Sequence, residues 1–483
     1  MIQFPPFEPD KAIFNPLAST VVNNVLPKAD GYGPMSQLVE YSAALPGQCY
    51  GFTYVRSSTG SYSVIAGTQT RLYKLDPTTL AWTDISGPSA PYSVPDSDRW
   101  SFAKFGSKLY ASTIGSPMQV YDVDAPLAWA DVGGGAPQCK YIAVGGDFLI
   151  GAHLNSTRPQ RVQWSAVNDP TFWTSGDRGS DYQDLPDGED ITGIFGNPTG
   201  AIIFQRKTIR EMTFDPSSGL VFRFTVLNPS RGSIAPLSIV QIGPTDFVYL
   251  CEDGFFRGVE GSPIGAERVD RTFLADINHD DLAVVRGVAD PFEKIVWWQY
   301  PDKLGAYKLL GYNWQLDRWI PADNDVTELG ASVSLGWTLN QMDSLGTLSA
   351  ITIPLDSRYW LGGTPMFGAF TADNRLAFFS GNPREATIET FDEQLVPGSR
   401  AFVSPKGVEV LTDASTYSLE IATSDFPGQG RTWGAALSPS TVTGRVPARR
   451  SGLLFRARLT IPADTAWNHA LGVNFNPIAE GQR

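Results

Sequence analysis

The side chains that could carry acid–base or nucleophilic chemistry are few and scattered along the 483-residue chain. The histidines, His153, His279 and His469, fall in different segments and lack the spacing of metal ligands. A hydrolase triad needs a histidine within hydrogen-bonding distance of a nucleophile, and only His153, in FLIGAH, lies in a clear strand pattern. The motifs HExxH, GxxxxGKS/T, GxGxxG and GxSxG are absent. We therefore expect no catalytic site, no cofactor and no metal site, and predict that the protein is not an enzyme.

Carboxylates are more abundant than histidines and are densest between residues 167 and 190. That segment holds Asp181, Asp184, Asp187, Glu189 and Asp190. Glycoside hydrolysis needs two carboxylates about 5–10 Å apart beside a sugar-sized cleft, so Asp187, Glu189 and Asp190 are candidates by abundance only. Asp-rich turns at 122–124, 278–281 and 323–325 do not follow the EF-hand loop, and ordinary turn chemistry explains them.

The cysteines Cys49, Cys139 and Cys251 are odd in number and far apart. They therefore offer neither a disulfide framework nor a zinc knuckle, and we expect three small buried hydrophobic side chains. No stretch approaches the ~18–20 apolar residues of a membrane helix, and the N-terminal MIQFPPFEPD does not have the pattern of a secretion signal.

The net charge is −13, from 37 basic and 50 acidic residues. A protein that binds nucleic acid tightly would be expected to carry a net positive charge. The charge is uneven, because residues 394–483 hold 9 basic and 6 acidic side chains, a net of +3. The densest basic cluster comprises Arg445, Arg449, Arg450, Arg456 and Arg458. Solvated loops that aid solubility explain both clusters equally well; the sharper interpretation is a repelling body and an attracting C-terminal part.

The elements that must position these residues repeat along the chain as short apolar runs joined by tight turns. Hairpin patterns occur at 52–67, 102–113, 141–153, 192–205, 239–250, 286–300 and 368–381, for example FAKF-GSK-LYAST. The runs are rich in Tyr, Phe, Val, Ile and Trp and alternate like strands, and Gly or Asp supplies the turns. A repeat of about 40–50 residues with four strands per unit is typical of a β-propeller. We therefore predict an all-β fold, a propeller of six to eight blades.

Three regions follow from this pattern. Residues 1–35 are predicted to be an extended N-terminal arm, with Phe4, Phe7 and Phe14 as anchors that pack on the chain's own body or across a neighbouring subunit. Residues 36–393 are the propeller. Residues 394–483 form a small C-terminal β module, or instead supply the strands that close the propeller ring.

The middle third carries motifs of a known family. RVQWSAVNDPTFW (161–173) holds a W-S-x-x-x-D-P-x-x-W element in Trp164, Ser165, Asp169, Pro170 and Trp173. A D-G-F hairpin follows at Asp253, Gly254 and Phe255, and an IGxERVD segment at Ile264, Gly265, Glu267, Arg268, Val269 and Asp270. Over about 160–280 the chain resembles the tail hub, or nozzle, proteins of short-tailed bacteriophages, relatives of the packaged-DNA stabilisation proteins. The N-terminal arm and residues 321–365 depart from that pattern.

The resemblance implies a structural β-propeller of the virion tail, assembled in the host cytoplasm. It implies a homo-oligomeric ring, a hexamer, with adaptor and portal-side proteins and tail fibre or spike proteins as partners. Such a ring extends the DNA channel and helps retain and release the genome, while double-stranded DNA passes without specific binding.

We expect Asp181, Asp184, Asp187, Glu189 and Asp190 to line that channel, because an acidic wall repels phosphates. We expect the arginines at 445–458, with the three phenylalanines of the arm, to form assembly interfaces. The alternatives are a carbohydrate-binding or carbohydrate-active propeller, and an intracellular scaffold propeller.

Overall fold

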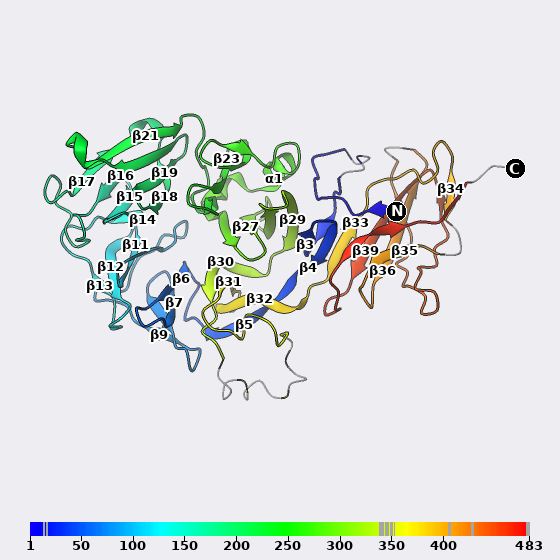
Figure 1. Ribbon diagram of the computed structural model, residues 1–483, viewed down its shortest axis with the longest axis horizontal. Helices are drawn as coiled ribbons and strands as arrows, with labels where there is room; N and C mark the ends of the chain where they lie inside the picture. Colours follow the sequence, from blue (N-terminus) through cyan, green and yellow to red (C-terminus); the bar gives the residue numbers. More distant parts are fainter. Residues whose placement is uncertain are drawn as a thin grey trace.

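Seven four-stranded antiparallel sheets follow one another around an axis, as Figure 1 shows on the left. The computed structural model describes residues 1–12, 15, 18–337, 342, 347, 351, 353–403, 407–426 and 429–479. The all-β propeller predicted from the sequence is confirmed, and its described part has seven blades.

The first four blades use their strands in chain order from the axis outward. Blade 1 is β6 (Phe52–Arg56), β7 (Tyr62–Gly67), β8 (Leu72–Leu75) and β9 (Trp82–Asp84); blade 2 is β10 (Ser101–Phe105), β11 (Lys108–Thr113), β12 (Ser116–Asp122) and β13 (Ala130–Asp131). Blade 3 is β14 (Cys139–Gly145), β15 (Phe148–Leu154), β16 (Arg158–Trp164) and β17 (Asp181–Asp184); blade 4 is β18 (Ile191–Asn197), β19 (Gly200–Gln205), β20 (Ile209–Phe214) and β21 (Phe222–Asn228). In blade 2, Phe105 pairs with Lys108, so Gly106 and Ser107 form a two-residue turn in which Gly106 has a φ of 61°.

Blades 5 and 6 follow the same rule, with short helices between them. Blade 5 is β22 (Val240–Gln241), β23 (Phe247–Cys251), β24 (Gly254–Arg257) and β25 (Ser262–Pro263); blade 6 is β26 (Arg286–Asp290), β27 (Ile295–Pro301), β28 (Tyr307–Asn313) and β29 (Arg318–Asp323). Within the described ranges, the short helices are η1 (Pro186–Gly188), η2 (Pro216–Ser218), η3 (Pro236–Ser238), α1 (Asp270–Asp276) and η4 (His279–Val284). No helix among the described residues is long and apolar enough to cross a membrane.

The last blade is closed by a strand from near the N-terminus. Blade 7 is β30 (Val326–Val333), β31 (Pro365–Thr371), β32 (Arg375–Pro383) and, outermost, β5 (Ser36–Ala44). The hairpin expected at 368–381 is therefore the middle pair of this blade, and the gap before it holds the inner strand and an insertion. The closing strand comes from residues 36–44, and not from the C-terminal region that the sequence also allowed.

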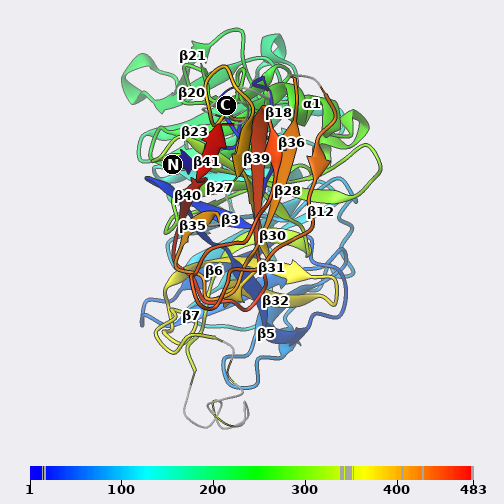
Figure 2. The same cartoon turned by 90° about the vertical axis from the view of Figure 1, so that its right-hand side faces the viewer.

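The remaining strands form a β-sandwich beside the propeller. One sheet runs β1 (Ile2–Gln3), β40 (Ala470–Asn474), β4 (Gly31–Pro34), β3 (Val25–Lys28), with β35 (Glu409–Thr412) also on β40; the other runs β2 (Val22–Asn23), β33 (Ala386–Glu389), β39 (Leu454–Ile461), β36 (Ser418–Ser424), β37 (Thr432–Trp433). A small third sheet joins β38 (Ser451–Gly452), β34 (Ala401–Val403) and β41 (Pro477–Ala479). Figure 2 shows β39 and β36 facing the viewer.

The N-terminal residues that the structure describes pack along the chain's own body, one of the two arrangements expected for the arm. β1 pairs with β40 and β2 pairs with β33, and β3 and β4 join the sheet of β40, so these four strands are part of the C-terminal sandwich. These short apolar strands form their backbone hydrogen bonds with strands that lie far along the chain. A local sequence pattern does not show such a pairing.

Propeller and sandwich share one hydrophobic core. Val25 and Tyr32 of the sandwich pack in the same buried cluster as Trp297, Leu309 and Ile320 of blade 6. Polar contacts reinforce this joint: Arg384 pairs with Asp325 at 2.7 Å, and the Asn24 amide donates to Asp323 at 2.7 Å. The two parts are therefore joined by a continuous packed interface.

Candidate functional site

Ion pairs link the inner strands of several blades near the propeller axis, at the end where these strands begin. Arg99 Nε lies 3.0 Å from Glu328 Oε2, and Arg286 contacts the other oxygen of the same carboxylate. Beside them Asp98 pairs with Lys140. These groups belong to, or directly precede, the inner strands of blades 2, 3, 6 and 7, so charged side chains bridge the axis at this end.

Burial sets the electrostatics of this axial cluster. The Glu328 side chain is only 2% exposed, and burial, with the neighbouring Arg99, lowers the pKa of Arg286 to about 9. Both arginines share one carboxylate, so removing that carboxylate would leave two buried guanidinium groups without their anion. The axial cluster is therefore a structural bridge between blades.

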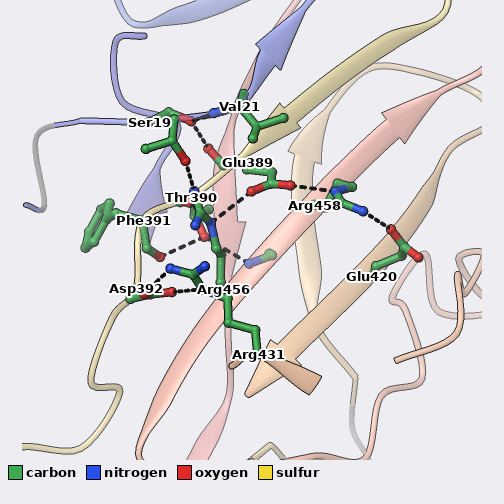
Figure 3. Close-up of polar contacts among 12 residues, drawn as sticks. Ser19, Val21, Glu389, Thr390, Phe391, Asp392, Glu420, Arg431, Arg456 and Arg458 are labelled. Carbon is green, nitrogen blue, oxygen red and sulfur yellow. Dashed lines mark hydrogen bonds and ion pairs between the residues drawn. The ribbon is translucent and has the colours of Figure 1, made fainter. Parts of the chain in front are cut away.

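Two arginines of the basic cluster lie inside the sandwich, as Figure 3 shows. Arg456, on the central strand β39, pairs with Glu389 at 2.9 Å, and both residues are buried. Arg458 lies opposite Glu389 on one neighbouring strand and Glu420 on the other, and pairs with them at 2.6 Å and 3.1 Å. Arg456 also donates to Thr20 Oγ1 at 2.6 Å. The network joins the N-terminal residues to three strands of the sheet.

This placement corrects the expected assembly surface. Arg456 and Arg458 are already neutralised within their own chain, so they do not present free charge to a partner. Arg449 is exposed, Arg445 and Arg450 are half-buried, and none of the three has an ion pair within the described part of the chain. Only these three keep the charge that a docking surface needs.

The phenylalanine anchors also lie within the chain. Phe4 is 3% exposed and belongs to the shared core, and Phe7 is half-buried between that core and the core of blades 5 and 6. The neighbouring backbone is held by Tyr32, whose hydroxyl donates to the Pro5 carbonyl at 2.8 Å. Phe14 falls outside the described residues. Phe4 and Phe7 therefore pack on their own body, one of the two arrangements expected.

The acidic segment lies at the outer edge of blade 3 and in the link to blade 4 (Figure 1). Asp184 pairs with Arg161 at 2.6 Å, Asp187 contacts Arg210, and Glu189 contacts Lys207. Hydrogen bonds from Arg161 and Lys207 lower the pKa values of Asp184 and Glu189. Three of the five carboxylates thus have cationic partners.

The other two carboxylates of the segment, Asp181 and Asp190, have no cationic partner among the described residues. Asp181 accepts a hydrogen bond from the Ser175 hydroxyl, and Asp190 is half-buried at the start of blade 4. The segment is less negative than its sequence indicates; Asp181 and Asp184 lie on the outer strand of blade 3, whereas Asp190 directly precedes the inner strand β18. Its role as the wall of a larger ring stays a prediction.

The three cysteines are buried and His153 is half-buried. All three cysteines are free and buried, and burial raises the pKa of each thiol to about 12. The His153 Nδ1 lies 2.9 Å from the Ile191 carbonyl oxygen, and burial lowers the pKa of this imidazole. No cluster of three or more His, Cys, Asp or Glu side chains that could hold a metal ion occurs among the residues described.

A cavity that no sequence pattern predicted lies at the junction of blades 6 and 7 with the sandwich. This junction pocket has a volume of about 410 Å³ and is lined by, among others, Glu293 and Trp297 of blade 6, Phe367 and Phe379 of blade 7, Met35 and Arg358. Burial raises the pKa values of Asp290 and Glu293, two carboxyls at its wall. The lining residues come from distant segments, so no local motif marks the pocket; only the acid pair in the DPFE turn is visible in the sequence.

No protein-family model matches the chain, and no curated protein matches it. Solved structures with a similar fold include the computationally designed Ika8 protein, at 10% identity over 74% of this chain and 96% of that one, with a TM-score of 0.38. BamB from Moraxella catarrhalis matches at 14% identity over 74% and 92% of the two chains, with a TM-score of 0.36. The C-terminal WD40 domain of Sif2 matches at 10% identity over 65% and 92%, with a TM-score of 0.33. We draw nothing about function from likenesses this distant.

Proposed function

We propose that this chain is a structural subunit of the tail of a short-tailed bacteriophage, a nozzle or hub ring. The ring extends the DNA channel below the portal and adaptor and helps retain and release the genome. The resemblance of residues 160–280 to tail hub proteins is the basis of the proposal. The geometry of the motif residues supports it, because their contacts are structural.

The observation that carries the proposal is the packing of two family motifs around one carboxyl. The Phe255 N–H donates to Asp270 Oδ1 at 3.2 Å. A Cβ atom at Gly254 would lie 2.2 Å from Asp270 Oδ2, and one at Gly265 would lie 2.0 Å from Oδ1. Only glycine fits at both positions, so the D-G-F and IGxERVD motifs form one joint between blade 5 and helix α1.

The same motif fastens the N-terminal segment. Arg268 pairs with Glu8 at 2.7 Å and with Asp317 at 2.8 Å. The Asp10 carboxylate accepts hydrogen bonds from the backbone N–H groups of Arg271 and Thr272, each at 2.8 Å. A motif whose Arg268 and Asp270 hold separate segments together suits a structural protein better than a catalyst.

The packed interface between propeller and sandwich supports a structural role for this chain in a ring. Charged side chains bridge the propeller axis at one end, so we place the DNA path between copies of the chain and not through a propeller. In this arrangement the acidic segment of blades 3 and 4 faces the path, where its unpaired carboxylates repel phosphates. Arg445, Arg449 and Arg450 dock an acidic face of an adaptor-side partner or a neighbouring copy.

The mass of the particles in solution tests this proposal. The purified full chain is measured by native mass spectrometry, alone and after mixing with the adaptor and portal-side proteins of the same virus. The proposal expects a closed ring, a hexamer, in at least one of the two samples. A monomer in both samples would contradict it.

A further inference from the structure

The junction pocket has no part in the proposed ring, and four separate parts of the chain build it. Blade 6 contributes the β26–β27 turn, blade 7 contributes the ends of β31 and β32, and Pro354 and residues 356–358 of the insertion form a further wall. Met35, between the sandwich and β5, completes it. Met35, Trp297 and Phe367 belong to the shared core, and the insertion wall is flanked by Ile353 and Tyr359 of the neighbouring core, so buried side chains support the pocket on both sides.

One side of the junction pocket is aromatic. Trp297 and Phe367 stack at an interplanar angle of 14°, with ring centroids 6.2 Å apart, and Phe367 and Phe379 stack at 12° and 4.6 Å. Phe292 projects at the rim with 61% of its surface exposed, and the Arg358 guanidinium lies 3.1 Å from the centre of its ring. Trp297 and Phe367 are buried in this stack, so the half-buried Phe379 and the exposed Phe292 are the rings with apolar surface that a ligand can contact.

The other side of the junction pocket has polar groups of both signs. Asp290, Glu293 and Asp356 supply carboxyls, and Arg358 supplies a guanidinium. Asp290 accepts hydrogen bonds from two backbone N–H groups of its own turn. Within the part of the chain that the structure describes, the side chains of Glu293, Asp356 and Arg358 have no hydrogen bond or ion pair. These groups are available to a ligand.

This combination selects among ligand classes. Arg358 would repel an organic cation, and the three carboxyls would repel an anion. A purely apolar molecule would remove water from the charged groups without replacing their hydrogen bonds. A sugar has hydroxyls that donate to carboxylates and accept from a guanidinium, and C–H faces that pack on aromatic rings. A volume of about 410 Å³ lies in the range of small-molecule sites. We propose that the junction pocket binds a neutral sugar of one or two rings, such as a unit of a surface polysaccharide.

Saturation-transfer NMR on the purified full chain tests this proposal. The probes are methyl α-D-glucopyranoside, methyl α-D-galactopyranoside, methyl α-D-mannopyranoside and maltose, with tetramethylammonium and methyl phosphate as charged comparisons. We expect transfer to the C–H protons of at least one neutral sugar, and none to the charged comparisons.

Two variants locate the binding. Glu293→Gln removes a charged acceptor and should weaken binding about tenfold or more. Phe292→Ala removes the exposed ring at the rim and should weaken it about threefold or more. Phe426→Ala is the matched control, because Phe426 is 58% exposed on the sandwich, and it should leave binding unchanged.

Three results would overturn the proposal: no transfer to any of the four sugars, transfer to a charged comparison alone, or equal sugar binding in the pocket variants and the parent. The proposal does not rest on ring formation. A monomer that binds sugar would reject the proposed tail function and leave the sugar site standing, and a ring that binds no sugar would do the reverse.

Discussion

The carboxylate of Glu389 holds the arginine network of the sandwich together, and its removal should destabilise the protein strongly. Glu389 is 2% exposed and pairs with both Arg456 and Arg458. Glu389→Gln keeps the shape of the side chain but removes its charge, which leaves Arg456 buried without the carboxylate it faces. Breaking a buried pair in this way costs about 3–5 kcal/mol.

The outer arginine of the network provides the matched comparison. The Arg458 side chain is 33% exposed, so water screens its pairs with Glu389 and Glu420, and a partly exposed pair contributes about 1 kcal/mol or less. Arg458→Gln should therefore have a much smaller effect than Glu389→Gln, although both remove one charge from the same network.

Thermal unfolding followed by scanning calorimetry separates these effects. For a chain of 483 residues that melts as one unit, a change of 1 kcal/mol moves the melting temperature by about 1 °C. Glu389→Gln should therefore lower it by about 3–5 °C and Arg458→Gln by about 1 °C or less. A melting temperature for Glu389→Gln within about 1 °C of the parent would refute the structural interpretation of the network.

Three further perturbations test other parts of the structure. Reversing the charge of Arg449 and Arg450 together should abolish ring assembly in native mass spectrometry without moving the melting temperature; normal assembly would reject the docking surface. Glu328→Gln should lower propeller stability by about 3–5 kcal/mol in calorimetry, because Arg99 and Arg286 lose their shared anion; an unchanged melting temperature would show that the axial pairs are not needed. Burial raises the pKa of Asp270 from 3.8 to about 6, so the stability it contributes is full below about pH 4 and is lost as the pH rises through about 6. Asp270→Asn should therefore melt higher than the parent at about pH 8 and like the parent at about pH 4, and a difference independent of pH would contradict the burial of this carboxyl.

The propeller was predictable because each blade is local in sequence. Hairpins such as 102–113 and 141–153 place strand-forming residues on both sides of a turn that glycine can make, and β10–β11 and β14–β15 pair as those patterns indicate. Blade 7 was less visible, because its inner strand β30 is separated from β31 by an insertion and its outer strand β5 comes from the other end of the chain.

The charged residues were harder to place, because charge is visible in a sequence and its neutralisation is not. The sequence pattern predicts a basic surface at Arg456 and Arg458, but they lie on a central strand whose neighbouring strands carry Glu389 and Glu420. The pattern predicts an acidic surface at Asp184 and Glu189, but Arg161 and Lys207 pair with them. Each partner is set by strand register or by a turn between blades, which a linear pattern does not specify.

An electron cryomicroscopy map of the ring formed with the adaptor proteins tests the central proposal most directly. It should show copies of one rigid propeller–sandwich unit around an opening wide enough for a DNA duplex, with the propeller axes filled at the end bridged by Arg99, Glu328 and Arg286. A map in which the copies form no ring, or in which DNA runs through the axis of a single propeller, would contradict it.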